Sequence, residues 1–231
     1  MLSNPLFGII ISLLAFNIGL YIYKKTKLAI LNPILISISI IVVILLRFNI
    51  PLEIYNNGGK LISFFLGPAT VVLAIPMYKQ LPALKSHMKA IIIGITTGVI
   101  TSITAVALLS KLFDLEHRLK LSLIPKSITT PIGIAVSESL GGLTPIAVIA
   151  IIITGIIGAV IAPLICKTFK IHHSVAKGIA IGTSSHAVGT SKALEMGETE
   201  GAMSSLSIAL TGVITVLLAP LLINIFSLIN L

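Results

Sequence analysis

Two polar stretches interrupt an otherwise apolar chain, and they hold most of the residues that could bind a solute. The first is PKSITTPIGIAVSESLGG, residues 125–142, and the second is GTSSHAVGTSKALEMGETEGAMSS, residues 182–205. Hydrocarbon cannot satisfy hydroxyl groups or loose backbone groups, so in a membrane such stretches must face protein or a water-filled cavity. We therefore interpret them as the solute-binding parts of a membrane transporter.

The first stretch places a positive charge among hydroxyl groups. Lys126 is followed by Ser127, Thr129 and Thr130. An ammonium group, hydroxyls and the positive end of a half-helix can together bind a carboxylate. In the alternative interpretation, Lys126 extends toward the outer membrane interface. We favour the binding role, because charges inside a membrane are functional by default.

The second stretch is dense in hydroxyl side chains, with five of them between residues 183 and 191. Small residues and hydroxyls also pack transmembrane helices together, but packing alone does not need this density. We predict substrate contacts from Ser184, Ser185, His186 and Thr190. His186 is the best candidate for proton coupling because its ordinary pKa lies near neutrality, although a neutral histidine making a structural hydrogen bond explains it equally well.

Two carboxylates, Glu138 and Glu195, follow the two polar tips at matching places. They are candidates for gating or ion coupling, or else for structural ion pairs with Lys126 or Lys192. The adjacent His172 and His173 diverge on a helix and have no Cys or carboxylate nearby, so we predict no metal site.

No sequence pattern of an enzyme is present. The chain lacks a nucleophile elbow, a Gly-rich phosphate loop and a zincin helix. Cys166 is the single cysteine, which excludes an internal disulfide and a thiolate metal site, and we assign it no role. We therefore expect no catalytic residue and no cofactor.

Composition places the chain in a lipid bilayer. Of its 231 residues, 56% are hydrophobic and only 10% are charged, which is too little polar surface for a soluble globule of this size. Apolar runs long enough to cross the hydrocarbon predict six full spans. They cover residues 6–23, 28–46, 61–77, 90–110, 145–165 and 206–228.

The basic residues predict the orientation. The loops 24–27, 78–89 and 166–177 hold nine lysines and no acidic residue, whereas the loops 47–60 and 111–120 hold five basic residues together with three acidic ones. Cytoplasmic loops carry an excess of Lys and Arg, so the first set should lie inside and the N-terminus outside. Short basic clusters between spans also exclude a nucleic-acid surface.

In this orientation residue 120 lies outside and residue 166 lies inside. The chain between them can therefore make only one net crossing of the membrane. Because residues 145–165 supply it, residues 121–142 should enter from the outside and return there as a re-entrant hairpin. By the same reasoning, residues 178–201 form a hairpin from the inside. A competing topology has both stretches cross fully as broken helices, and the lysines of the loop 166–177 make us rank it second.

The predicted fold is an all-α polytopic membrane protein, with about six full spans and two re-entrant or broken-helix hairpins in inverted orientation. Pro131, Gly141, Gly182 and Gly189 support breaks within the hairpins. We expect one transmembrane domain over residues 1–231, with N-terminal spans up to residue 120 and two hairpin-plus-span units over 121–231. Inverted repeats of this kind are typical of secondary transporters.

The segments PKSITTPI, SESLGG and GTSSHAVGTSKALEMGETEGAMSSL, together with LGPATVVLAIPMYKQ at residues 66–80, resemble the LrgB/CidB family over nearly the whole chain. Members have been described as antiholin-like effectors of murein hydrolase activity and lysis, usually beside a small holin-like LrgA/CidA partner. Plastid relatives carry glycolate and glycerate, and bacterial pairs have been linked to pyruvate uptake. The resemblance therefore implies a carrier of small carboxylates.

Our main prediction is a secondary transporter of small monocarboxylates, of the pyruvate, glycolate or glycerate class, that works by alternating access with a coupling proton or sodium ion. The alternative is an antiholin-like membrane regulator of murein hydrolase activity and lysis, acting with a holin-like partner. We expect a homo-oligomer in a bacterial-type inner membrane, with an LrgA/CidA-type partner as a further expectation and no nucleic acid.

Overall fold

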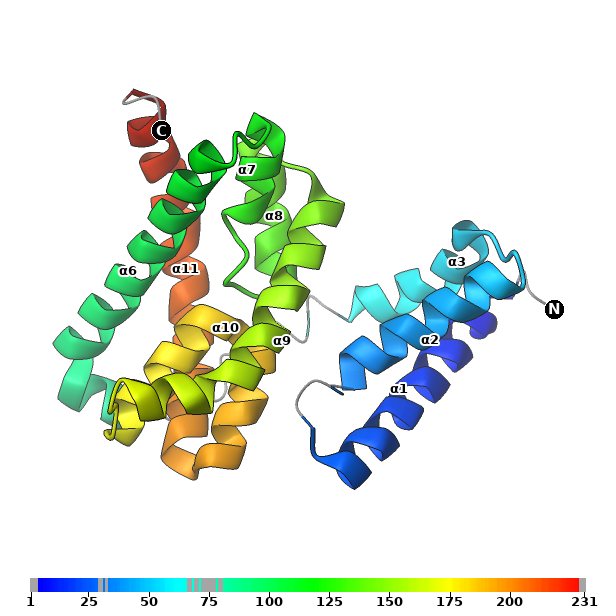
Figure 1. Cartoon of the computed structure of the whole chain (residues 1–231), viewed down its shortest axis with the longest axis horizontal. Coiled ribbons are helices and arrows are strands. Elements are labelled where there is room, and N and C mark those ends of the chain that lie inside the picture. Colours follow the sequence, from blue (N-terminus) through cyan, green and yellow to red (C-terminus); the bar gives the residue numbers. More distant parts are fainter. Residues whose placement is uncertain are drawn as a thin grey trace. The chain divides into compact units, whose positions relative to one another are not determined.

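The computed structural model describes residues 4–28, 31, 33–65, 68, 71, 78 and 81–228. The chain divides into two compact units, Met1–Val72 (unit 1) and Leu73–Leu231 (unit 2), and each is considered by itself. The described part of the chain contains nine helices and no strand, so the predicted all-helical class is confirmed there (Figure 1).

The described part of unit 1 contains three helices: α1 (Leu6–Thr26), α2 (Pro33–Arg47) and α3 (Leu52–Phe64). Glycines let them approach closely, because a Cβ added to Gly8 of α1 would collide with the Tyr55 carbonyl of α3. A Cβ added to Gly19 would lie 2.6 Å from the Pro33 carbonyl oxygen at the start of α2. The hydroxyls of Ser12 and Tyr55, 2.9 Å apart, add a polar link between α1 and α3.

The other six helices lie in unit 2, counted over its described residues, and local residues account for several of their ends. Proline occupies the first turn of α8 and of α9, where its missing N–H costs nothing. Gly141, at φ 84°, ends α8 in the left-handed conformation that glycine adopts without strain. The six helices are α6 (Leu81–Leu112), α7 (His117–Leu123), α8 (Thr130–Leu140), α9 (Thr144–Thr168), α10 (Ser174–Met196) and α11 (Glu198–Leu228).

The chain around the first polar stretch folds back on itself. This segment runs from α7 through the non-helical residues 124–129, called tip 1 here, into α8. Its two ends meet, because the Leu143 N–H donates a 2.6 Å hydrogen bond to Ser122 Oγ. A Cβ on Gly142 would likewise lie 2.9 Å from the Ser122 backbone nitrogen. The chain therefore returns at residue 143 to the place that it left at residue 122.

The second polar stretch also folds back, at His186 within α10, where φ 43° and ψ −142° interrupt the helix. A Cβ on Gly189 would lie 3.1 Å from Ile181 Cγ2, whereas residues eight apart in a straight helix are about 12 Å apart. Lys177 Nζ and Glu200 Oε1, 3.7 Å apart, connect the start of α10 to the first turn of α11. Residues 177 and 200 therefore lie side by side. The bend around His186, residues 183–190, is called tip 2 here.

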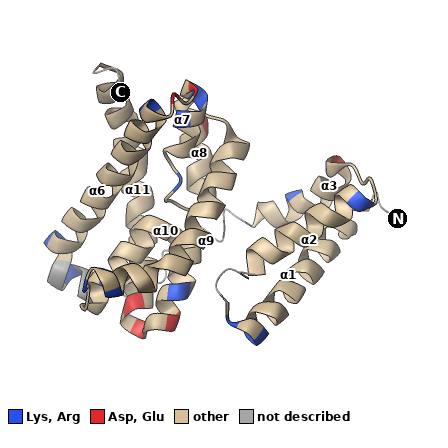
Figure 2. Ribbon diagram, in the orientation of Figure 1, with Lys and Arg blue, Asp and Glu red and all other residues tan. Residues whose placement is uncertain are grey.

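An apolar core joins α6, tip 1, α8 and α11. Its most buried members include Ile95, Ile103, Ile128 and Leu206. The outer faces of the long helices are apolar as well, for example at Ile149 and Ile153 of α9, which are 53% and 50% exposed. In Figure 2 the charged residues of unit 2 gather near helix ends, and the middle of the long helices carries almost none. Such apolar outer faces suit a hydrocarbon environment.

Four helices in the described part of the chain are long and apolar enough to cross a membrane, which fits a multi-pass membrane protein. They match the predicted spans 6–23, 90–110, 145–165 and 206–228. The predicted span 28–46 corresponds to the shorter α2, of 15 residues. Of the predicted span 61–77, the structure describes only residues 61–65, 68 and 71, and α3 ends at Phe64. Most of this predicted span therefore lies outside the described residues.

Candidate functional site

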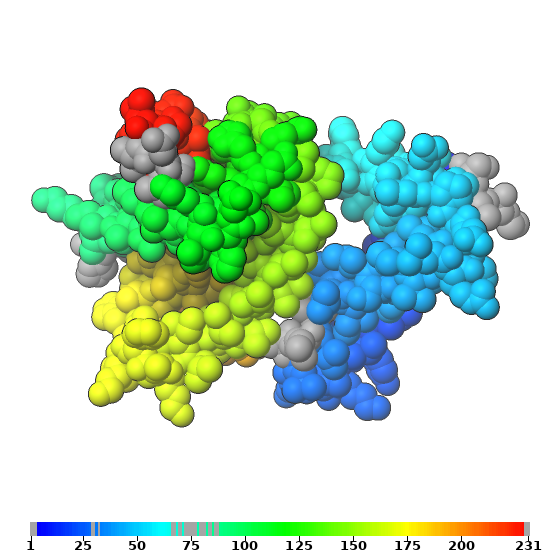
Figure 3. All heavy atoms as spheres, turned by 45° about the horizontal axis from the view of Figure 1, so that its top comes forward, coloured from blue at the N-terminus to red at the C-terminus, as the bar shows by residue number. Residues whose placement is uncertain are grey.

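A cavity of about 1000 Å³ lies within unit 2, between α6, tip 1, α9 and the first half of α10. In the space-filling view, α6 (green) and the residues around the α9–α10 connection (yellow) border a recess on one face of unit 2 (Figure 3). Both polar tips reach the cavity: Lys126 and Ser127 come from tip 1, and Thr183, Ser184 and Ser185 come from tip 2.

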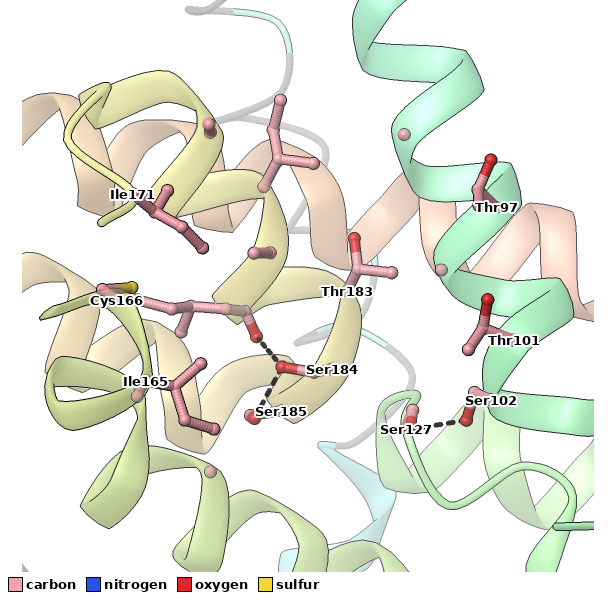
Figure 4. A pocket seen from close by; sticks show the side chains of 18 of the residues that line it. Thr97, Thr101, Ser102, Ser127, Ile165, Cys166, Ile171, Thr183, Ser184 and Ser185 are labelled. Carbon is pink, nitrogen blue, oxygen red and sulfur yellow. Dashed lines mark hydrogen bonds between the residues drawn. The ribbon is translucent and has the colours of Figure 1, made fainter. Parts of the chain in front are cut away.

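Tip 1 presents a positive charge held by neutral hydroxyls. Lys126 Nζ donates to Ser102 Oγ at 3.2 Å and to Ser127 Oγ at 3.1 Å. The two hydroxyls are themselves 3.1 Å apart (Figure 4). Among the described residues, no carboxylate lies within ion-pair distance of Lys126. Its charge is therefore free to balance that of a bound anion.

Tip 2 presents hydroxyls to the same cavity. The Ser184 and Ser185 oxygens are 3.0 Å apart, and Ser184 Oγ donates to the Ile181 carbonyl at 3.3 Å. Glycines on the neighbouring spans make room for this tip. A Cβ on Gly158 of α9 would collide with Ser185 Oγ, and one on Gly98 of α6 would lie 2.8 Å from Thr183 Cγ2. Tip 2 therefore fits between two helices at positions where they have no side chain.

The rest of the cavity wall is mainly apolar. Ile157, Ile161 and Ile165 of α9 line it, as do Val175 and Ile179 of α10. Figure 4 shows Ile165 and Cys166 across the cavity from Thr97, Thr101, Ser102 and Ser127. The hydroxyls of α6 and tip 1 thus lie on one side of the cavity with Lys126, and the hydroxyls of tip 2 lie beside the apolar residues of α9 on the other.

The cavity brings together four of the eight residues predicted to bind substrate. Lys126, Ser127, Ser184 and Ser185 line it, whereas Thr129, Thr130, His186 and Thr190 are outside its lining. Thr129 precedes α8 and is buried, and Thr130 is the first residue of α8. Thr129 is thus the last residue of tip 1, and Thr130 begins the helix that follows it.

His186 and Thr190 hold the bend of tip 2. The buried His186 ring donates from Nε2 to the Ile151 carbonyl of α9 at 2.8 Å. It occupies space that Gly155 leaves open, since a Cβ there would lie 2.6 Å from the ring. Thr190 Oγ1 donates to the His186 carbonyl at 2.9 Å and lies 2.7 Å from Ser204 Oγ of α11. These contacts secure tip 2 against α9 and α11.

The two predicted gating carboxylates lie at exposed positions outside the cavity lining. Glu138 Oε1 accepts a 3.3 Å hydrogen bond from Thr144 Oγ1 at the start of α9. Glu195 Oε2 accepts from Lys192 Nζ at 2.8 Å, which is one of the structural partnerships considered for it. In the described part of the chain, no three His, Cys, Asp or Glu side chains come together as a metal site would require.

Sequence reasoning missed the contribution of α6. Thr97, Thr101 and Ser102 line the cavity, and Ser102 accepts a hydrogen bond from Lys126. A usable signal was present, because hydroxyls at positions 97 and 101 lie one helical turn apart on the same face of an apolar run. Isolated Ser and Thr residues are common in helix packing, however, so the sequence alone does not distinguish these hydroxyls from packing residues.

Comparison with known proteins identifies relatives over almost the full length. The model of the LrgB-like family matches residues 12–225. Proteins named antiholin-like protein LrgB from Bacillus mycoides (strain KBAB4) and Bacillus cereus (strain B4264) are each 39% identical to the chain over 219 residues. The match covers 94% of this chain and 95% of each relative. No solved structure matches the chain significantly.

Proposed function

The chain belongs to the LrgB-like family, and from this premise we propose that it performs the antiholin-like membrane function for which its relatives are named. The observation that carries the proposal is the 39% identity over 94% of the chain. In this role the protein restrains membrane leakage caused by a small holin-like partner and so controls murein hydrolase activity. The proposed partner is of the LrgA/CidA type, and the proposed location is a bacterial inner membrane.

The test is the timing of lysis in a bacterial host that produces the small holin-like partner with or without this chain. We expect the chain to delay the loss of membrane potential and the onset of lysis. A Lys126→Met variant tests whether the cavity takes part, since it removes the charge at tip 1 and nearly keeps the length of the side chain. Identical lysis with and without the chain would refute the antiholin-like role.

The geometry favours a second candidate function, secondary transport of a small monocarboxylate. Its support is the cavity at which both folded-back tips meet, with the Lys126 charge unpaired by any described carboxylate. Because the ends of each tip segment lie together, at Ser122–Leu143 and at Lys177–Glu200, we propose that both segments are re-entrant and enter from opposite faces. Tips that meet within the bilayer are a common architecture of transporter sites.

In this mechanism, the Lys126 ammonium and the Ser127 hydroxyl bind the substrate carboxylate, and Ser184 and Ser185 approach it from the other tip. Ionised groups form shorter and stronger hydrogen bonds than neutral ones, so the carboxylate is held mainly by Lys126. Movement of the tips relative to α6 and α9 would expose the site to each face in turn, driven by a proton or sodium gradient. The substrates proposed are acids of the pyruvate, glycolate or glycerate class.

Uptake of labelled pyruvate, glycolate and glycerate into proteoliposomes tests the transport proposal. We expect saturable uptake by the parent protein, a loss of at least tenfold in Lys126→Met, and partial activity in Lys126→Arg. Lys192→Met is the matched control, because Lys192 lies outside the cavity lining and pairs with Glu195 at an exposed position. Leakage without saturation would reject transport and leave the antiholin-like role standing.

A further inference from the structure

We infer that two buried threonines, Thr183 of tip 2 and Thr211 of α11, bind the oxygen on the second carbon of a small hydroxy or keto acid. The inference rests on the proposed solute site and assigns it two specificity-determining residues. It follows from a second, smaller cavity next to that site and from the hydroxyl groups that line it.

The smaller cavity lies within unit 2, where α6, tip 1, tip 2 and α11 come together. Its volume of about 10 Å³ is close to the minimum that one water-sized group requires. Ser102, Ser127 and Thr183 line this cavity and the large one alike, so the two cavities meet at these side chains. A solute bound in the large cavity therefore has space for one further oxygen atom at this junction.

Two hydroxyl groups in the smaller cavity are without a partner. Thr183 Oγ1 and Thr211 Oγ1 are buried and form no hydrogen bond with any described residue. Only 7% of Thr183 and 1% of Thr211 is exposed. A hydroxyl on a helix can bond the carbonyl four residues before it, as Ser207 of α11 does at the Met203 carbonyl. Buried hydroxyls are nearly always paired, and a bound solute supplies the partner that these two lack.

Lys126 places the solute beside this smaller cavity. Its ammonium group donates to Ser102 and Ser127, two hydroxyls that line both cavities. In a 2-hydroxy or 2-keto acid, the carbon that bears the additional oxygen is bonded directly to the carboxylate carbon. A carboxylate held by Lys126 in the large cavity therefore brings this oxygen to the junction, within reach of Thr183 and Thr211.

Threonine hydroxyls suit both kinds of acid. Each can donate to a keto oxygen, and each can either donate to a hydroxyl or accept from it. Acetate and propionate carry only hydrogen at that position, so their binding would leave both threonines unpaired. A site built to hydrogen-bond an oxygen rejects the analogue that lacks it more strongly than a hydrophobic pocket rejects a shorter chain. The two threonines thus select acids that carry an oxygen on the second carbon, as pyruvate, glycolate and glycerate do.

The experiment compares acids of equal length and charge that differ in this oxygen: glycolate with acetate, and lactate with propionate. The full chain is used in lipid nanodiscs, and thermal shift over a range of concentrations gives the affinity for each acid. We expect each hydroxy acid to bind about tenfold more tightly than its counterpart, which corresponds to about one net hydrogen bond. Thr183→Val and Thr211→Val should each weaken glycolate by a similar factor and leave acetate unchanged.

Three further variants serve as controls. Thr211→Ser keeps the hydroxyl and should retain most of the preference. Ser110→Ala removes another buried hydroxyl that has no partner among the described residues but lines neither cavity, so it should leave all affinities unchanged. Lys126→Met should abolish the binding of all four acids, because it removes their shared anchor. Without an acid, Thr211→Val should unfold no earlier than the parent protein, which separates a loss of binding from a loss of stability.

The outcomes separate this subsite from the proposed transport function. If glycolate and acetate bind equally through Lys126, the solute site stands and the subsite is wrong, and this comparison needs no variant at either threonine. If the preference persists in both Thr183→Val and Thr211→Val, the oxygen is bound elsewhere and the inference is overturned. If none of the four acids binds, the inference and the transport proposal both fail.

Discussion

Buried hydroxyl groups in unit 2 fall into two kinds. Thr190 Oγ1 and Ser204 Oγ, 2.7 Å apart, satisfy each other between α10 and α11. Thr211 Oγ1, by contrast, is buried with no hydrogen-bond partner among the described residues. Removing a partner leaves the remaining buried group unsatisfied, at a cost of about 1–3 kcal/mol, whereas removing an unpaired group does not. We therefore expect replacement of threonine by valine to affect stability differently at these two positions.

We expect Thr190→Val to lower the stability of the protein by about 1–3 kcal/mol, because it leaves Ser204 without its partner. Thr211→Val should leave stability unchanged or raise it, since the substitution conserves side-chain volume and removes an unpaired hydroxyl. Thermal unfolding of both purified variants in one detergent measures the difference. Equal destabilisation by the two substitutions would show that Thr211 has a partner in the membrane, such as an ordered water molecule.

Of the polar residues that the sequence singled out, some reach the cavity and others do not. A lysine and several hydroxyls within an apolar chain identified Lys126, Ser127, Ser184 and Ser185, all of which line the cavity. His186 and Thr190 have equally polar side chains, but they are turned toward α9 and α11. Sequence alone does not show which side of a bend a side chain faces, because that depends on the φ and ψ angles of one residue.

At the scale of helices, glycines decide how closely the tips and spans can pack. We expect Gly158→Ala to destabilise the protein, because its Cβ would collide with Ser185 of tip 2. Overpacking of this kind costs about 1–3 kcal/mol, more than the roughly 1 kcal/mol that alanine gains over glycine within a helix. Gly94→Ala on α6 is the matched control, since a Cβ there meets nothing within 4 Å. Thermal unfolding should show a loss for the first variant and none for the second.

A side-chain hydrogen bond joins the residues on either side of the first polar stretch, Ser122 and Leu143. Ser122→Ala removes the acceptor of the Leu143 N–H, so we expect a loss of about 1–3 kcal/mol. Ser139→Ala is the control, because Ser139 is exposed and bonds only its own helix, at the Val136 carbonyl. Hydrogen exchange at the Leu143 amide provides a second, local measurement. Unchanged protection of that amide in Ser122→Ala would contradict the proposed closure.

Helix breaks could be predicted where proline or glycine causes them. Pro131 and Gly141 bound α8 as expected. The break in α10 falls at His186. This residue lies between Gly182 and Gly189, the two glycines from which the sequence predicts a helix break. Those glycines instead allow close packing: Gly182 lies against the Ser204 carbonyl, and Gly189 lies against Ile181. A positive φ at histidine is uncommon, and contacts with α9 and α11 stabilise it here, so local sequence gives no signal of it.

At the scale of the whole molecule, the topology can be tested by labelling. In a Cys166→Ser background, single cysteines replace Glu116, Glu138, His173 and Glu195, all of which are exposed. With re-entrant tips, positions 116 and 138 react with an impermeant reagent from outside, and positions 173 and 195 react only from inside. Fully crossing helices would instead place 116 and 138 on opposite faces and would likewise separate 173 from 195.

Membrane character and most of the long helices follow from the sequence, because length and apolar composition alone define a helix that can span a bilayer. Two other features of the molecule could not be predicted from the sequence. The boundary of the compact units at residue 72 lies inside an apolar run, with no polar linker to reveal it. The short helix α7 follows a loop and has only seven residues, too few for a hydrophobic period to be recognised.

The single residue Gly197 connects α10 to α11. Gly201 of α11 packs directly against Leu194 of α10, so the second half of α10 and the beginning of α11 form a stiff corner. The transport proposal requires tip 2 to move relative to α9, and with this corner in place the start of α11 has to move together with the second half of α10.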